Sequence, residues 1–275
     1  MTEVELWDFL AKQGLADNGS AFRKLKGGYL NSVWRVDTPD GCLVTKEFAK
    51  PMAGTLFPNL PEDEAEALRR LAGLDVAPDL VGFWPDASLL VYDYVEGPMW
   101  DGDIANVAQL LLRKEAADQT GFRTVPLTIP DIIAEGDALF ARCASQPVAN
   151  FPPAANVPPP QKLSLIHTDI GVNLVGSGSN LRLIDWQCPA IGDPIVDIVM
   201  FLSPGMHEIY GSGKLSMKDH EVFLMSLSFD LCERYNIIGP LYHWRLAAYC
   251  FWKAEQGFIE YENAALAEID LLKMI

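Results

Sequence analysis

Four polar residues in the segment 165–186, LIHTDIGVNLVGSGSNLRLIDW, stand between short apolar runs that would hold them in place: His167, Asp169, Asn173 and Asp185. A carboxylate fixed beside a substrate hydroxyl, as Asp169 would be, can accept its proton during phosphoryl transfer. Asn173 offers a neutral oxygen that Mg²⁺ accepts, and a carboxylate at a strand end, such as Asp185, can coordinate Mg²⁺ between nucleotide phosphates. The segment predicts either a catalytic loop with a metal site or, more simply, a polar hairpin.

The bulk composition narrows the classes of partner. The 275 residues include 37 acidic and 21 basic side chains, giving a formal net charge of -16. This acidity argues against nucleic acids and anionic membranes and suits small cations or metal-bound anions, although it also aids solubility. No run approaches the roughly 18 apolar residues of a membrane span, and the acidic N-terminus does not resemble a signal peptide. Five scattered cysteines indicate free thiols, so we expect a cytoplasmic protein.

Hydrophobic periodicity divides the chain into two parts. Up to residue 96, alternating apolar residues and turn sequences predict a β-rich unit, whose main helix begins at Pro61 with carboxylates in its first turn. From residue 97 on, apolar residues recur at helical spacing. The expected strands are 22–26, 32–36, 42–48, 76–84 and 88–97, with a small hairpin of 174–175 and 181–184. The expected helices are 3–14, 61–74, 104–118 and 130–145, with several more after 195.

The polar segment and its continuation, HTDIGVNLV…LRLIDWQCPAIGDPIVDI, resemble the catalytic signature of the aminoglycoside phosphotransferase and choline kinase-like family, which has a protein-kinase-like fold. The family pattern is H-x-D, a downstream Asn, D-W or D-F, and then G-D-P-x-x-D. The resemblance implies that Asp169 is the catalytic base and that Asn173 and Asp185 are metal ligands. It also implies that His167 braces the loop and that Asp197, the last aspartate of the pattern, stabilises it.

The catalytic loop is one residue shorter than is common in kinases. Three residues separate Asp169 from Asn173, where four are usual. Gly171 can adopt backbone angles that other residues avoid, so it could absorb the deletion. A one-metal site and a catalytically weak relative are the alternatives that this spacing leaves open.

Residues 1–96 contain, in order, the other elements that an ATP-dependent kinase needs. The turn KGGYLNSV matches the family pattern G-G-x-x-N-x-V, and LLVYDYVEG occupies the position that meets adenine. Lys46 on a strand would contact the phosphates, and Glu64, or alternatively Glu66, would orient it. A buried lysine needs such partners, although a solvent-facing lysine is the simpler alternative. The residues expected to bind nucleotide are Gly27, Gly28, Asn31, Lys46, Glu64, Asp93, Tyr94 and Val95.

Together these features predict an α+β, bilobal protein-kinase-like fold, with a small antiparallel β-sheet lobe (1–96) and a larger, mainly helical lobe (97–275). The resemblance implies transfer of the γ-phosphate of ATP, with Mg²⁺, to a hydroxyl of a small molecule. The implied acceptor is a choline-like amino alcohol, an amino sugar or an aminoglycoside-like compound, and the acidic chain suits a cationic one. A catalytically weak nucleotide-binding protein with a regulatory or interaction role is the alternative.

Two further groups of residues carry weaker signals. Three histidines lack metal-ligand spacing, and we expect them at the surface or as helix caps: His207, His220 and His243. Four aromatic residues fall on one predicted helix, where core packing is the simplest expectation and an acceptor-pocket wall the alternative: Trp244, Tyr249, Phe251 and Trp252.

Overall fold

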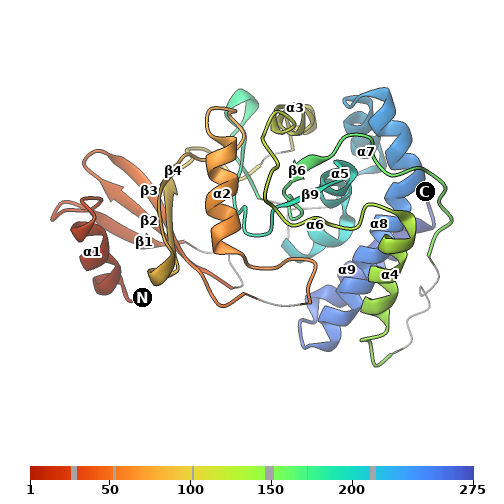
Figure 1. Cartoon of the computed structure of the whole chain (residues 1–275), viewed down its shortest axis with the longest axis horizontal. Coiled ribbons are helices and arrows are strands. Elements are labelled where there is room, and N and C mark those ends of the chain that lie inside the picture. Colours follow the sequence, from red (N-terminus) through yellow and green to blue (C-terminus); the bar gives the residue numbers. More distant parts are fainter. Residues whose placement is uncertain (26–29, 52–53, 101, 146–151, 172, 211–214) are drawn as a thin grey trace.

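A five-stranded antiparallel sheet forms one end of the molecule, and helices form the other (Figure 1). The computed structural model describes all residues except 26–29, 52–53, 101, 146–151, 172 and 211–214. The sheet has the order β1-β2-β3-β5-β4. Its strands are β1 (Ala21–Lys24), β2 (Ser32–Thr38), β3 (Gly41–Glu47), β4 (Leu80–Trp84) and β5 (Leu89–Asp93).

The two faces of the sheet pack against different helices because side chains alternate along each strand. Helix α1 (Glu3–Lys12) buries Leu6 and Leu10 against residues of β2 and β5. On the opposite face, helix α2 (Pro61–Leu71) contacts β4 and β5. Lys46 pairs in register with Val33 and Leu90, which lie in or against the main core cluster. The alternation therefore points Lys46 toward the interior and the helical part of the chain.

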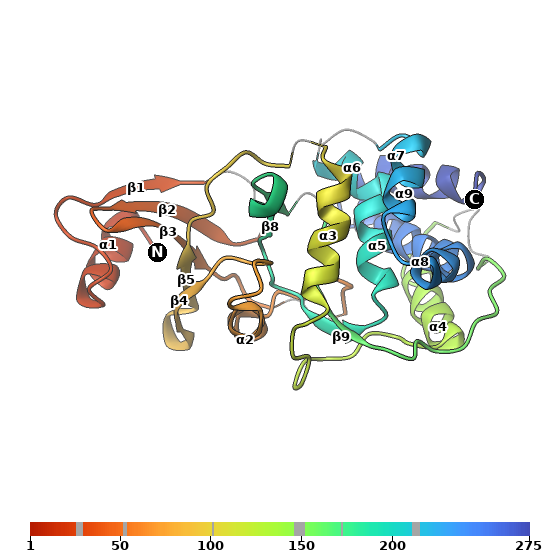
Figure 2. The ribbon, with the colours of Figure 1, turned by 90° about the horizontal axis from the view of Figure 1, so that it is seen from above.

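The helical part is built around one long helix, α8 (Phe229–Glu255), which contacts α4, α5 and α9 (Figure 2). The other helices are α3 (Ile104–Lys114), α4 (Ile129–Phe140), α5 (Ile195–Leu202), α6 (Pro204–Tyr210), α7 (Met217–Met225) and α9 (Glu260–Leu272). Two short antiparallel pairs carry the catalytic signature: β6 (Ser164–Ile166) with β9 (Ala190–Gly192), and β7 (Leu174–Val175) with β8 (Arg182–Leu183). Short 3₁₀ turns occupy Pro85–Ala87 and Gly178–Asn180.

The connection between the sheet and the helices passes close to the small β7–β8 hairpin. Gly97 has φ +135°, and a Cβ at this position would lie 2.7 Å from the Cα of Gly176. Only glycine combines this backbone conformation with such a close approach. The division of the chain at residues 96 and 97 stays a prediction, and it falls at this crossing point.

The α+β, bilobal kinase-like architecture predicted from the sequence is confirmed, but the histidines were placed wrongly. His207, His220 and His243 are all buried. Hydrogen bonds make this burial tolerable, because His243 contacts both Glu268 (Nδ1–Oε2 2.7 Å) and Tyr235 (Nε2–Oη 3.1 Å).

Two other expectations concern thiols and membrane spans. All five cysteines are free, as predicted. In the described part of the chain, no helix has both the length and the apolar character needed to cross a bilayer.

Candidate active site

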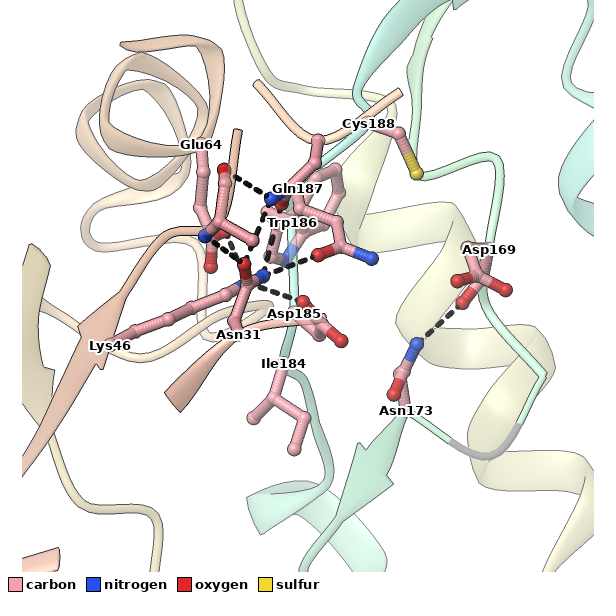
Figure 3. Close-up of polar contacts among 12 residues, drawn as sticks. Asn31, Lys46, Glu64, Asp169, Asn173, Ile184, Asp185, Trp186, Gln187 and Cys188 are labelled. Atoms are coloured by element: carbon pink, nitrogen blue, oxygen red, sulfur yellow. Dashed lines mark hydrogen bonds and ion pairs between the residues drawn. The ribbon is translucent and has the colours of Figure 1, made fainter. Parts of the chain in front are cut away.

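A buried lysine stands between two carboxylates at the junction of the sheet and the helices (Figure 3). Lys46 Nζ lies 2.5 Å from Glu64 Oε2 and 2.5 Å from Asp185 Oδ1. The exposed fractions of Lys46 and Glu64 are only 2% and 1%. Because an unpaired buried charge is strongly unfavourable, Lys46 and Glu64 depend on each other for their burial, and the part-exposed Asp185 adds a second counter-charge. The solvent-facing alternative for Lys46 is wrong, and its carboxylate partner on α2 is Glu64, whereas Glu66 pairs with Arg69 and Arg70.

Burial and the neighbouring charges set the protonation of this triad. Burial raises the pKa of Glu64 to about 7, with Lys46 opposing the rise. Burial alone would lower the pKa of Lys46, but Asp185 and Glu64 outweigh it and hold the pKa above its ordinary value. The lysine is therefore a fixed positive charge at neutral pH, suited to phosphate oxygens.

Asp169 lies on the loop after β6, and its carboxyl group is almost fully buried, with 5% of the residue exposed. Burial, reinforced by repulsion from Asp185, raises the pKa of Asp169 well above its ordinary value, while Lys46 acts in the opposite sense. A carboxylate with a raised pKa is a better proton acceptor than an ordinary aspartate. The local environment of Asp169 therefore fits general-base chemistry.

Asp197, at the start of α5, holds the backbone of this loop. Its carboxylate accepts hydrogen bonds from the backbone N–H groups of His167 (3.0 Å) and Thr168 (2.9 Å). The buried ammonium of Lys114 lies 3.2 Å from the same carboxylate and also donates to Leu165 O. Thr168 itself has φ +66°, an unfavourable conformation for a β-branched residue that this network maintains. The loop-stabilising role predicted for Asp197 is confirmed by these contacts.

The imidazole of His167 connects the Asp169 loop to residues 184–186. Its Nε2 contacts Ile184 O at 2.9 Å, and its ring packs edge-on against Trp186 at a centroid distance of 4.6 Å. Asp185, between these two residues, has φ +64°. The histidine thus ties the Asp169 loop to the segment that presents Asp185.

Asn173 closes the shortened loop. Its Nδ2 donates to Asp169 O at 2.8 Å, and Gly171 has φ +23°, at the edge of the region that glycine tolerates best. The Oδ1 atom of Asn173 accepts no hydrogen bond from the described residues, which leaves a neutral oxygen donor. Figure 3 shows Lys46, Asp185, Asn173 and Asp169 following one another across the site.

One cavity of about 580 Å³ connects these side chains. Its lining includes Lys46, Asp169, Asn173 and Asp185. A carboxylate and an amide oxygen are hard donors that fit Mg²⁺, which usually completes its coordination with phosphates and water. The described residues hold no group of three or more His, Cys, Asp or Glu able to bind a metal by themselves. The donor set thus fits a metal shared with a phosphate ligand.

Besides Lys46 and Glu64, the predicted nucleotide-binding residues divide into three groups. Gly27 and Gly28 lie outside the described residues. Asn31 lines the cavity, but protein groups saturate its amide: Nδ2 donates to Gln187 Oε1 (2.8 Å) and Asn59 Oδ1 (3.0 Å), and Oδ1 accepts from Ala49 N (3.0 Å) and Asn59 Nδ2 (2.8 Å). This network links Ala49 and Asn59 to Gln187, and it favours a supporting role for Asn31 over direct contact with nucleotide.

The third group is the predicted adenine-binding segment after β5. Tyr94 and Val95 line the cavity, whereas Asp93 is exposed and is not part of the lining. The backbone N–H groups of Asp93 and Tyr94 already donate to Asp79 O and Cys42 O, both at 2.9 Å. Of the three, Val95 lines the cavity and has a backbone N–H that donates no hydrogen bond to a described residue.

The opposite side of the cavity was predicted only as an alternative, in which aromatic residues of one helix, Tyr249 among them, form an acceptor-pocket wall. It is lined by residues of α6, α8, α9 and the turn before α9: Met206, Tyr210, Tyr249, Lys253, Phe258 and Tyr261. The sequence offered one signal, the i, i+4 spacing of Tyr249 and Lys253 on one helix, which places them on the same face. Of the four aromatic residues singled out on α8, Trp244 and Tyr249 are buried in the core, and Tyr249 also lines the cavity.

Comparison with known proteins gives no match in sequence but clear matches in fold. The sequence matches no protein-family model and no curated protein. The fold matches choline kinase LicA from Streptococcus pneumoniae, with a TM-score of 0.64 and 18% identity over 98% of this chain and 99% of that one. It also matches a choline/ethanolamine kinase family protein from Mesorhizobium loti, with a TM-score of 0.66 and 17% identity over 99% and 95%.

A third match is spectinomycin phosphotransferase APH(9)-Ia, solved with ADP and spectinomycin. Its TM-score is 0.62, with 13% identity over 99% of this chain and 93% of that one. At these identities the likeness establishes the fold. The chain has the fold of the choline kinases and aminoglycoside phosphotransferases, which confirms at this level the resemblance seen in its signature.

Proposed function

We propose that the protein transfers the γ-phosphoryl group of ATP, with Mg²⁺, to a hydroxyl group of a small molecule. The observation that carries this proposal is the convergence of Lys46 with Asp169 and Asp185, from two distant parts of the chain, on one cavity. Structures of the same fold support it, since LicA was also solved with AMP and the spectinomycin enzyme with ADP.

Each residue has a role in this proposal that follows from its position. Lys46, oriented by Glu64, binds phosphate oxygens, and Asp185 with Asn173 would hold Mg²⁺, which neutralises charge on the phosphates when bound. Asp169 orients the acceptor hydroxyl and takes up its proton. Positioning and electrostatic stabilisation account for most of the catalysis in this chemistry, which suits a site whose charged groups are fixed by buried ion pairs.

The nucleotide would enter between the sheet and the helical part. The turn containing Gly27 and Gly28 would cover the phosphates, and the segment of Asp93, Tyr94 and Val95 would meet adenine, with the N–H of Val95 as the donor. The family resemblance suggests choline-like, amino-sugar or aminoglycoside-like acceptors. Because such chemistry uses cytoplasmic ATP and the five cysteines are free, we place the protein in the cytoplasm.

The first test is Asp169→Asn, with the exposed Asp86→Asn as a matched control. We expect Asp169→Asn to lower acceptor-dependent ADP release by about 10²–10⁴-fold, because the proton acceptor is lost, while the affinity for Mg-ATP changes little. Turnover is followed by a coupled ADP assay and affinity by calorimetry. Near-normal turnover of Asp169→Asn would remove this residue from its role, and Mg-ATP binding without turnover of any alcohol would favour a regulatory nucleotide-binding protein.

A further inference from the structure

The acceptor side of the cavity contains an ammonium group of its own. Lys253, on α8, lines the cavity, and only 9% of it is exposed. Its Nζ lies 3.8 Å from the ring centroid of Phe258, 5.8 Å from that of Tyr261 and 6.0 Å from that of Trp252. These rings attract a cation through their π faces, which is how proteins bind quaternary ammonium ligands. In this chain, the cation that occupies the aromatic group is a side chain of the protein.

Among the residues that the structure describes, Lys253 differs from the other buried lysines in having no carboxylate within ion-pair distance. Lys46 pairs with Glu64 and Asp185, and Lys114 pairs with Asp197. Within the described residues, the ammonium of Lys253 forms neither an ion pair nor a hydrogen bond. Burial lowers the pKa of Lys253, and the nearby carboxylate of Glu260 acts in the opposite sense. A buried ammonium without a bonded counter-charge favours binding of an anion beside it.

Lys253 and Asp169 line the same cavity from different elements, α8 and the loop after β6. Tyr210 of α6 and Tyr249 of α8 line it with them. Lys253 follows Tyr249 by four residues on α8, which places both side chains on the same face of the helix with an axial rise of about 6 Å between them. A ligand in this cavity can therefore meet the Asp169 loop with one group and Lys253 with another.

We propose that the acceptor is a small alcohol bearing an anionic group, a carboxylate or a phosphate, which pairs with Lys253 while the hydroxyl meets Asp169. This inference rests on the proposed function and departs from the cationic acceptor that the acidity of the chain suggested. A trimethylammonium group is disfavoured at this site, because Phe258 and Tyr261 already face an ammonium that would repel it. Lys253 is thus a specificity-determining residue of the acceptor site.

The test uses two series of matched alcohols that differ only in the charge of one end. The six-carbon series is gluconate, sorbitol and glucamine, which are anionic, neutral and cationic. The three-carbon series is glycerate, glycerol and 3-amino-1,2-propanediol, in the same order of charge. Choline is tested as a further cation, and glycerol 3-phosphate as the alcohol that bears a phosphate. Binding is measured by calorimetry with Mg-ADP present, and turnover by ADP release with Mg-ATP. We expect the wild-type protein to bind and use the anionic member of at least one series at least tenfold better than its aminated counterpart.

The variants Lys253→Met and Lys253→Arg assign this preference to the ammonium. Lys253→Met should raise KM for the anionic acceptor at least tenfold and abolish the preference for it over the neutral member of the series, whereas Lys253→Arg should retain the preference. The exposed Lys218→Met on α7 is the matched control and should behave as wild type.

Several outcomes would overturn the inference. Preferred binding or turnover of choline, glucamine or 3-amino-1,2-propanediol by the wild-type protein would contradict it and leave the proposed function standing. The same holds if Lys253→Met keeps the full preference for an anion, or if the wild-type protein binds Mg-ADP but none of the anionic compounds. Absence of Mg-nucleotide binding would instead contradict the proposed function, and the inference with it.

Discussion

The two sides of the cavity are built by different physical means. The nucleotide side consists of charged residues in mutual contact, with Lys46 held by Glu64 and Asp185. The proposed acceptor side consists of aromatic rings and one ammonium, Lys253, which forms no ion pair with a carboxylate in the described part of the chain. On the nucleotide side, carboxylates of the protein neutralise the lysine. On the acceptor side, we propose that a ligand neutralises Lys253.

This contrast separates the phosphate-binding chemistry proposed for the cavity from the selection of its acceptor. A closed ion-pair network fixes positions and tolerates little change, because removing one member leaves a buried charge unpaired. An aromatic wall with one unpaired charge can instead change its ligand by changing a single side chain. The difference explains how a fold shared with a choline kinase and a spectinomycin phosphotransferase could serve another acceptor.

The largest expected effect tests whether the nucleotide side is a closed network. Lys46→Met leaves Glu64 buried without its counter-charge and should lower the free energy of unfolding by about 3–5 kcal/mol, with loss of turnover. In Lys46→Met/Glu64→Leu, both charges are replaced by apolar groups, so most of the stability should return while turnover stays lost. Denaturant unfolding and ADP release measure the two effects.

The exposed Lys50→Met is the control for this pair of variants and should match the wild-type protein in both measurements. A single variant as stable as wild type would show that the buried triad contributes no net stability. A double variant with restored turnover would remove Lys46 from the phosphate site.

A smaller effect concerns the support of the acceptor side. His220, on α7, is buried near His207 of α6 and His243 of α8, the helices that supply Tyr210 and Lys253 to the cavity. Burial, reinforced by the other two histidines, lowers the pKa of His220 to about 4, whereas Glu268 and Asp219 oppose the shift. In the unfolded chain, His220 therefore takes up a proton near pH 6.5. In the folded chain, it takes up this proton only near pH 4.

The neutral form of His220 thus keeps its full contribution to the free energy of unfolding above pH 6.5. As the pH falls toward 4, this contribution is lost, by about 3 kcal/mol in total. In His220→Gln, the fall in unfolding free energy between pH 6.5 and 4 should be smaller by about this amount, with Lys218→Gln on the same helix as control. We expect acid to weaken acceptor binding before Mg-ATP binding. Identical pH profiles for His220→Gln and wild type would contradict this account of the helical support.

The difference between the nucleotide side and the acceptor side also explains which parts of the molecule could be predicted from the sequence. The nucleotide side follows short motifs whose spacing is visible along the chain, so Lys46, Glu64, Asp169 and Asp185 could be proposed without coordinates. Asn31 matched its motif, yet its amide bonds to Asn59 and Gln187, which lie far along the chain and were not part of the pattern. A motif therefore locates a residue more reliably than it assigns the contacts of its side chain.

The acceptor side was predicted only in part, as an alternative role for Tyr249, because its residues meet only through helix packing. Tyr210, Lys253 and Tyr261 come from α6, α8 and α9, and periodicity within any one helix indicates only a buried face. The buried histidines illustrate the same limit. His243 is stabilised by Glu268, which lies on α9, and by Tyr235, which lies on an earlier turn of α8. Contacts between distant segments carry this information, and local spacing does not.

The most direct test of the central claim is the affinity of ATP measured with and without Mg²⁺ for the wild-type protein, Asp185→Asn and Asp169→Asn. We predict that Mg²⁺ strengthens ATP binding to the wild-type protein and to Asp169→Asn equally, and that Asp185→Asn loses this dependence because its carboxylate can no longer hold the metal against the phosphates. Undiminished Mg²⁺ dependence in Asp185→Asn, or no nucleotide binding by the wild-type protein, would contradict the account.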